Sequence, residues 1–199
     1  SPKFREANLQ EKNYQFSLVG KKHGLTGRTS NQQASLIIYG RGISQMVDVK
    51  EYYKTYVATC EIAELHERLH EEVLKLKPSF LFEFGCGSGK NLLRLRQLDP
   101  NILQSIGVDI SEQNIQNAQE ILKNLNQSFL DLADEAILKT FITNDFDVTF
   151  TCSVLDHIEN IDEIIQHFKR ISKTGIILAE TNDIPGDFYY SHNYESFGF

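Results

Sequence analysis

The sequence predicts an α/β fold: a doubly wound, mainly parallel sheet with helices on both faces. Two observations predict it. After residue 78, short apolar runs alternate with helical stretches, the order typical of crossover units. A glycine-rich turn joins the first of these runs to a helix, as in sheets that bind ligands beyond the carboxyl ends of their strands. The length of 199 residues suits one compact domain with an added arm.

The first third of the chain divides into an arm and a helical segment. Residues 1–47 are expected to form an irregular, basic arm, in which the apolar run 35–39 is a candidate strand. Asp48 is a candidate N-cap for residues 49–77, one helix or two in succession, which Pro78 ends. Apolar residues there recur at steps of three and four, as one helix face requires, at Ile62, Leu65, Leu69, Val73 and Leu76.

Beyond Pro78, strands and helices alternate. The expected strands are residues 80–84, 105–109, 128–130, 146–153 and 175–180. The expected helices are residues 90–98, 111–124, 133–143 and 160–171. We therefore expect the arm (1–47) to precede one domain (48–199), in which a helical lid (48–77) is followed by a ligand-binding core (78–182).

Charge and composition narrow the classes of function. The net charge is −7, yet residues 1–50 hold eight Lys and Arg against three Asp and Glu, so the remaining body is strongly acidic. An acidic body disfavours broad nucleic-acid binding, and the basic arm is either a solvated surface or a contact for an anionic substrate. No apolar run suits a membrane span, and no signal peptide is visible. Three widely spaced cysteines indicate neither a disulfide framework nor a zinc cluster, so the expected compartment is the cytoplasm.

The segment from Glu83 to Lys90, with the sequence EFGCGSGK, follows a strand and opens a helix. Three kinds of ligand-binding loop compete for it. A dinucleotide-binding fingerprint needs a third glycine where Lys90 stands. A phosphate-binding P-loop needs glycine at position 84 and Ser or Thr at position 91, where the chain has Phe84 and Asn91.

The third kind fits every position. An acid two residues before the first glycine, followed by Gly-x-Gly-x-Gly, resembles the first motif of class I S-adenosylmethionine-dependent methyltransferases. The resemblance covers residues 78–182. Asp109 closes the second strand 24 residues after Gly85, Asp131 follows the third strand, and residues 146–158 look like the fourth strand and its loop. The resemblance implies a Rossmann-like fold, a methyltransferase activity and S-adenosyl-L-methionine as the cofactor.

The resemblance also implies a role for residues of the site. Gly87 lets the turn pass close under the methionine part of the cofactor, and Glu83 orients its ammonium group. Asp109 accepts hydrogen bonds from the ribose hydroxyls. Asp131 faces the adenine amine, and Ile110 or the residue after Asp131 packs against the ring. The full set expected at the cofactor is Glu83, Gly85, Cys86, Gly87, Gly89, Asp109, Ile110, Asp131, Leu132 and Ser153.

The expected catalytic residue is His157, which follows the fourth strand at the mouth of the site. Methyl transfer needs a base only when the acceptor arrives protonated, as a hydroxyl does, and histidine titrates near neutrality. Relatives often carry histidine here for local structure, so a base role and a structural role both stay open. Asp156 and His192 are weaker candidates, and Glu180 is a candidate for the acceptor pocket.

The expected acceptor is a small molecule, such as a sugar or another hydroxyl compound. Residues 153–155 read Ser-Val-Leu where amino-directed nucleic-acid methyltransferases have Asp/Asn-Pro-Pro-aromatic. Two alternatives remain: a nucleic-acid methyltransferase, favoured by the basic arm, and a regulatory domain that binds S-adenosylmethionine without turnover. Three tyrosines lie on the helical segment before the ligand-binding core: Tyr52, Tyr53 and Tyr56. They are either buried in the hydrophobic interior, which is the more frequent outcome, or form an aromatic face that stabilises the sulfonium.

Two features depart from this interpretation. His66-Glu67-x-x-His70 matches a zinc-peptidase helix motif and makes a zinc metallopeptidase a remote alternative. No third ligand is evident, so we expect a solvated helix face and no metal.

The family normally has seven strands, but few residues follow the fifth strand here. The fold is therefore expected to be truncated after that strand, or covered at its edge by residues 36–39.

Overall fold

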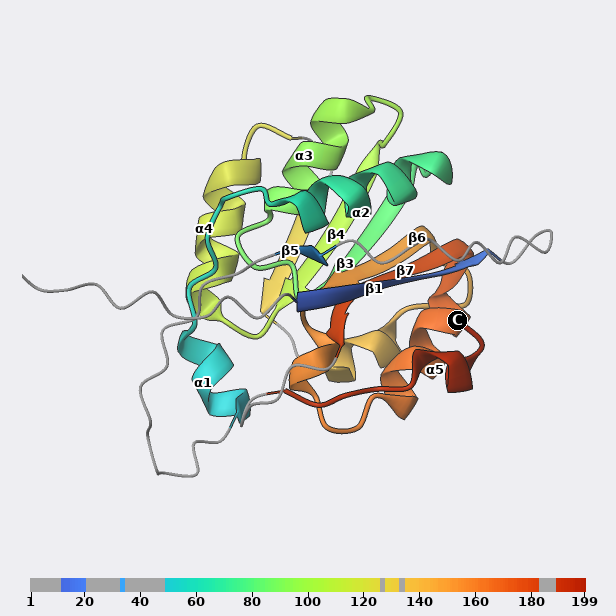
Figure 1. Cartoon of the computed structure of the whole chain (residues 1–199). Helices are drawn as coiled ribbons and strands as arrows, with labels where there is room; N and C mark the ends of the chain where they lie inside the picture. The colour runs from blue at the N-terminus through green and yellow to red at the C-terminus, as the bar shows by residue number, and fades with distance from the viewer. Residues whose placement is uncertain (1–11, 21–32, 35–48, 126–127, 133–134, 183–188) are drawn as a thin grey trace, which may run out of the picture.

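The computed structural model describes residues 12–20, 33–34, 49–125, 128–132, 135–182 and 189–199. The strands form one seven-stranded sheet in the order β2-β1-β7-β6-β3-β4-β5 (Figure 1). Its parallel part consists of β3 (Phe80–Phe84), β4 (Gln104–Asp109), β5 (Ser128–Leu132), β6 (Phe146–Cys152) and β7 (Ser172–Asn182). β1 (Lys12–Gly20) runs antiparallel to β7, and β2 (Gln33–Ala34) runs antiparallel to β1.

The strand order reverses at β3. From β3 the chain moves outward through α3 (Lys90–Leu98) to β4 and through α4 (Glu112–Leu122) to β5. It then returns to the other side of β3 with β6 and, after α5 (Asp162–Ile171), with β7. Open α/β sheets bind ligands outside the carboxyl ends of the strands at such a reversal, so this edge of β3 is the expected place for a site.

Helices cover both faces of the sheet because successive side chains of a strand point to opposite faces. Leu81 of β3 belongs to a core cluster with residues of α3, α4 and α2 (Glu64–Lys75). Its neighbour Phe82 belongs to a second cluster with α5 and the 3-10 helix η1 (Glu135–Thr140). Figure 1 shows α2 and α3 on one side of the sheet and α5 on the other. The predicted doubly wound α/β fold is therefore confirmed.

The helices follow the sequence pattern closely. The segment 49–77 forms two helices, α1 (Val49–Thr55) and α2. Ser111 caps α4 as predicted, because its Oγ accepts the N–H of Asn114 at 3.3 Å. The expected helix over 133–143 is a shorter 3-10 helix, η1. Two further 3-10 helices, η2 (Leu155–His157) and η3 (Tyr194–Phe197), lie after β6 and near the end of the chain.

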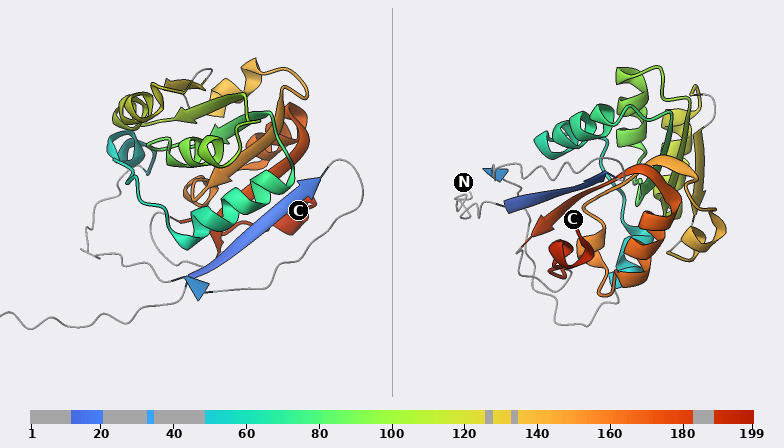
Figure 2. Two further views of the ribbon diagram at one scale, coloured as in Figure 1. Left: turned by 90° about the horizontal axis from the view of Figure 1, so that it is seen from above. Right: turned by 90° about the vertical axis from the view of Figure 1, so that its right-hand side faces the viewer.

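The expectation of an irregular arm is wrong for residues 12–20. They form β1, whose register pairs Asn13 with Asn182 and Gly20 with Gly175 (Figure 2). The segment alternates polar and apolar residues in NYQFSLV, a period of two that indicates a strand. The edge of β7 is therefore covered from the start of the chain. The run 36–39, expected to cover it, lies outside the described residues.

Candidate functional site

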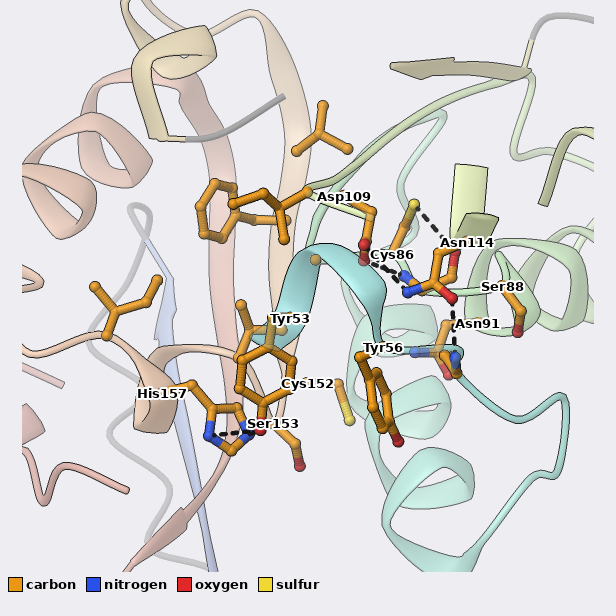
Figure 3. Close-up of a pocket in the computed structure, with 18 of the residues that line it drawn as sticks. Tyr53, Tyr56, Cys86, Ser88, Asn91, Asp109, Asn114, Cys152, Ser153 and His157 are labelled. Carbon is orange, nitrogen blue, oxygen red and sulfur yellow. Dashed lines mark hydrogen bonds between the residues drawn. The ribbon is translucent and has the colours of Figure 1, made fainter. Parts of the chain in front are cut away.

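A cavity of about 610 Å³ opens at the carboxyl ends of β3, β4 and β6, where the strand order reverses. One wall is the turn between β3 and α3, which we call the glycine turn (residues 85–89). The start of α4 and the residues after β6 form two further walls, and α1 closes the side opposite the sheet. Figure 3 shows these elements converging on one space, with Asp109 and His157 at different ends of it.

The glycine turn adopts a backbone that disfavours side chains. Gly85 and Gly87 have φ values of +74° and +52°, in the left-handed region. A Cβ on Gly85 would lie 2.3 Å from Cγ2 of Val154, so the turn and the residues after β6 touch without room for a methyl group. The turn is held down on β4 because the Gly85 and Cys86 N–H groups both donate to the Val108 carbonyl, at 2.9 and 2.8 Å. Gly85 and Gly87 therefore present backbone alone to the cavity, and Cys86 and Ser88 line it beside them.

Asp109 faces the glycine turn across the end of β4. Its Oδ2 accepts the N–H of Gly87 at 2.8 Å, and its Oδ1 accepts the N–H of Ser111 at 2.9 Å and Nδ2 of Asn114 at 3.2 Å. A carboxylate has about four lone-pair sites, so one remains for a ligand hydroxyl after these three donors. The two features on which the sequence interpretation depended, the turn and this acid, thus lie at one end of one cavity.

Glu83 is fully buried behind the glycine turn. Its Oε1 accepts Nδ2 of Asn91 at 2.8 Å, whereas its Oε2 has no hydrogen-bond partner among the described residues. Burial raises the pKa of Glu83 to about 8, although the hydrogen bond from Asn91 opposes this shift. Asn91 lines the cavity and Glu83 does not. Glu83 can therefore act on a ligand in the cavity through its hydrogen bond with Asn91 or through a bridging water.

His157 ends η2 at the other end of the cavity. Glu180 holds this turn in place, since its Oε2 accepts the N–H groups of Val154 at 2.9 Å and Leu155 at 3.0 Å. Tyr53 Oη lies 3.1 Å from His157 Nδ1 and 3.0 Å from Nε2, so the phenol can donate to either nitrogen. Glu180 is fully buried and is not a lining residue, so its expected place in the acceptor pocket is wrong.

Two of the three tyrosines before the core, Tyr53 and Tyr56, form part of the cavity wall. Tyr52 and Tyr56 are each 42% exposed, and α1 has no buried residue, so the expectation of core residues is wrong. Tyr53 and Tyr56 line the cavity, with ring centroids 5.6 Å apart (Figure 3). Desolvation raises the pKa of Tyr53 far above its usual range, so its phenol stays protonated.

The cavity does not include every residue expected at the cofactor. Gly85, Cys86, Gly87, Asp109, Ile110 and Ser153 line it. Gly89 does not. It forms the N-cap of α3, where its φ of +77° favours glycine. Asp131 and Leu132 lie at the carboxyl end of β5, paired in register with Val108 and Asp109, and their side chains are outside the description.

Two residues of the site, Asn91 and Asn114, were not predicted from the sequence motifs. Asn91 and Asn114 both line the cavity and are nearly buried, on helices whose neighbouring residues pack into the core. A polar residue beside core positions in the first turn of a helix is the signal that could have found them, because a buried amide needs partners.

The two histidines of the zinc-peptidase motif, His66 and His70, form hydrogen bonds within the fold. His70 is buried and its Nε2 lies 3.0 Å from Oδ1 of Asn91, so the expected solvated face is wrong for this residue. His66 Nδ1 accepts the N–H of Ala63 at 2.9 Å and so satisfies a donor at the start of α2. Across the residues the structure describes, no three His, Cys, Asp or Glu side chains converge as a metal site would need. The described helices also include none with the length and apolar character of a membrane span.

Comparison with known proteins identifies the fold unit. Residues 82–177 match the family model of a methyltransferase domain. A curated relative, the tRNA U34 carboxymethyltransferase of Desulfotalea psychrophila, is 26% identical over 129 residues. These matches point to the class I S-adenosylmethionine-dependent methyltransferase family, which the sequence motifs resemble. The match covers 63% of this chain but 39% of that relative, so the chain spans about two fifths of the relative's length.

One solved structure agrees with this family at the level of the fold. The N-terminal domain of EvdMO1 with SAH bound has a TM-score of 0.51 and 20% identity, over 59% of this chain and 49% of that one. The YcgJ protein from Bacillus subtilis has a TM-score of 0.49 and 18% identity, over 57% of this chain and 51% of its own. The likeness to EvdMO1 shows a shared fold.

S-adenosylmethionine is the cofactor of this family, and the cavity fits it in three respects. Gly85 and Gly87 line the cavity and, without side chains, let a ligand approach their backbone closely. The unpaired Oε2 of Glu83 is a buried acceptor behind the cavity wall that suits an ammonium group through a bridging water. Asp109 keeps one acceptor site, which suits a ribose hydroxyl. The residues present therefore fit the amino-acid and ribose parts of the cofactor.

Proposed function

We propose that this chain transfers the methyl group of S-adenosylmethionine to a hydroxyl group of a small molecule. The position of His157 carries the proposal, because this imidazole lines the same cavity as the glycine turn and Asp109. The volume of about 610 Å³ lies within the range of roughly 300–1,000 Å³ typical of small-molecule sites. In this proposal residues 78–182 bind the cofactor and residues 48–77 act as a lid.

The chain's own residues account for the steps around the transfer. Bound S-adenosylmethionine supplies a methyl group activated by a sulfonium. The residues of the cofactor end, Glu83, Gly87 and Asp109, hold it in a fixed orientation, which accounts for a large part of such a rate enhancement. An acceptor hydroxyl must lose its proton as its oxygen gains the methyl group, and an imidazole nitrogen of His157 takes that proton. Asp156 Oδ1, 3.4 Å from His157 Nε2, stabilises the imidazolium that results.

Replacing His157 with alanine is expected to lower turnover by about 10²- to 10⁴-fold, the usual share of a general base. Cofactor affinity should stay nearly unchanged, because the glycine turn and Asp109 are at the other end of the cavity. Steady-state kinetics and calorimetric titration measure the two effects. His167 on α5, which does not line the cavity, is the matched histidine control. Unaltered turnover in H157A would leave only the structural role.

An RNA acceptor is the second candidate, because the curated relative is named as a tRNA-modifying enzyme. The cavity wall carries the cations Lys50 and Lys90 against the acids Asp109, Glu135 and Glu159, which is a poor match to a polyanion. Labelled cofactor and a cell extract decide between the two. Methylation of a small molecule should survive treatment of the extract with ribonuclease, whereas loss of label would favour RNA. Bound cofactor with no labelled product would favour a regulatory domain without turnover.

We also propose that the protein is located in the cytoplasm. Cys60, Cys86 and Cys152 are free thiols in the described structure, and Cys60 is exposed. Thiols without partners are typical of reducing compartments, which supports a cytoplasmic location.

A further inference from the structure

A short segment between α1 and α2 lies against the cofactor end of the cavity. Residues 56–61, which we call the strap, contribute Tyr56, Ala58 and Thr59 to the cavity lining. A Cβ on Gly87 would lie 3.0 Å from the Cβ of Ala58, so the strap packs directly on the glycine turn. The strap therefore forms part of the enclosure into which the cofactor of the proposed function would fit.

The strap is held mainly by polar side chains. Five of its six residues are exposed and Ala58 is half-buried, so it buries little apolar surface. Its backbone is bonded instead by four side chains from the cofactor end of the site. Ser111 Oγ donates to the Tyr56 carbonyl at 2.9 Å, Asn114 Oδ1 accepts the Ala58 N–H at 2.8 Å, Ser88 Oγ donates to the Thr59 carbonyl at 3.2 Å, and Lys90 Nζ donates to the Glu61 carbonyl at 2.9 Å. Segments with few apolar contacts open at low free-energy cost, so these bonds determine how closed the strap stays.

Asn114 differs from the other three side chains because it also holds Asp109. Its Oδ1 accepts from the strap, while its Nδ2 donates to Asp109 Oδ1 at 3.2 Å, and the side chain is nearly buried. An amide carries its acceptor and its donor on two separate atoms, so one uncharged side chain can bond the strap and Asp109 at once. The same residue thus orients the carboxylate of Asp109 and fixes the strap.

We propose that Asn114 is a positioning residue that joins the strap to Asp109 and so closes the cofactor pocket at its ribose end. The proposal rests on the ribose role of Asp109 in the proposed function. The bond from Asn114 Nδ2 to Asp109 directs the remaining acceptor site of this carboxylate into the cavity. The bond from the Ala58 N–H to Asn114 Oδ1 keeps the strap closed beside the glycine turn. Asn114→Asp removes the donor and keeps an acceptor, whereas Asn114→Ala removes both.

The first experiment needs no cofactor. Hydrogen exchange of the strap amides is measured in the wild type, Asn114→Ala and Asn114→Asp, with thermal melts as a check on folding. Exchange at Ala58 should rise about fivefold or more in Asn114→Ala, for the loss of one hydrogen bond of about 1 kcal/mol. It should stay near the wild-type rate in Asn114→Asp. Equal rates in all three proteins would overturn the link between Asn114 and the strap.

The second experiment measures S-adenosylmethionine affinity by calorimetry. Both Asn114 variants should bind about tenfold more weakly or worse, because each loses the donor to a charged carboxylate. Asn117→Ala on the same helix is the matched control and should keep the wild-type affinity, since Asn117 bonds Gln113 and does not line the cavity. Wild-type affinity in Asn114→Asp would overturn the positioning role. A wild-type protein that binds no S-adenosylmethionine would refute the proposed function and the ribose part of this inference, while the exchange result still decides the strap.

Discussion

Replacing Asp109 with alanine should weaken S-adenosylmethionine binding by more than tenfold and should also lower the free energy of unfolding by about 1–3 kcal/mol. The first effect follows from losing a charged acceptor for the ribose hydroxyls, in the proposed role of this residue. The second follows from the donors that Asp109 satisfies, which include the backbone N–H groups of Gly87 and Ser111. Removing the carboxylate leaves these donors without a partner beside the cavity.

Calorimetric titration and urea unfolding measure the two effects separately. Asp147 offers a matched control, because its Oδ2 also accepts two backbone N–H groups, those of Ser79 and Phe80, at 2.9 and 3.0 Å. It lies by the amino end of β3, away from the cavity. Asp147→Ala should therefore lose stability and keep cofactor affinity. If Asp109→Ala lost stability alone, the ribose role would be wrong.

The second large effect is expected at Glu83. Its pKa in the folded protein is raised to about 8 from an ordinary value near 4.5. Between these two pH values the native state holds a proton that the unfolded state has released, so stability falls as pH rises, by up to about 1.4 kcal/mol per pH unit. Glu83→Gln removes this dependence. The cofactor-free variant should therefore gain stability over the wild type as pH rises from about 5 to 8, measured by urea unfolding at several pH values.

The same substitution should impair cofactor binding. An ammonium group favours the charged form of Glu83, so wild-type affinity should increase with pH up to about 8 and then level off. Glu83→Gln should bind about tenfold more weakly or worse at pH 8 and lose this rise. Adenosine, which has no amino-acid tail, is the control ligand and should bind both proteins alike. A cofactor affinity that does not respond to Glu83→Gln would show that this buried carboxyl serves the fold alone.

Much of the core could be predicted from sequence because its signals are local. Phe80–Phe84 is an apolar run that both core clusters bury, and the glycine turn after it requires backbone that only glycine adopts easily. Asp109 could be located because strand ends in a parallel sheet meet at one edge. These features depend on residues close together in the chain, so pattern and spacing suffice.

The missed features depend on partners far away in the sequence. The strand β1 is stabilised by pairing with β7, and a short alternating segment does not indicate which edge it will join. His70 lies on a helix rich in charged residues, and its burial follows from Asn91 on another helix. The role of Asn114 depends on the strap, 56 residues earlier. None of these contacts has a periodicity that a sequence could display.

The pairing of β1 with β7 has a consequence for the order of assembly. It joins Asn13 to Asn182, so the first described strand is completed by the last one. Closing so long a loop loses chain entropy before the stabilising contacts between β1 and β7 can form. Contacts between residues far apart in the sequence therefore slow folding. A chain emerging from the ribosome must therefore release the residues up to Asn182 before β1 can pair along the full length of β7. After β7 has formed and before β1 docks, the outer edge of β7 is open to strands of other chains.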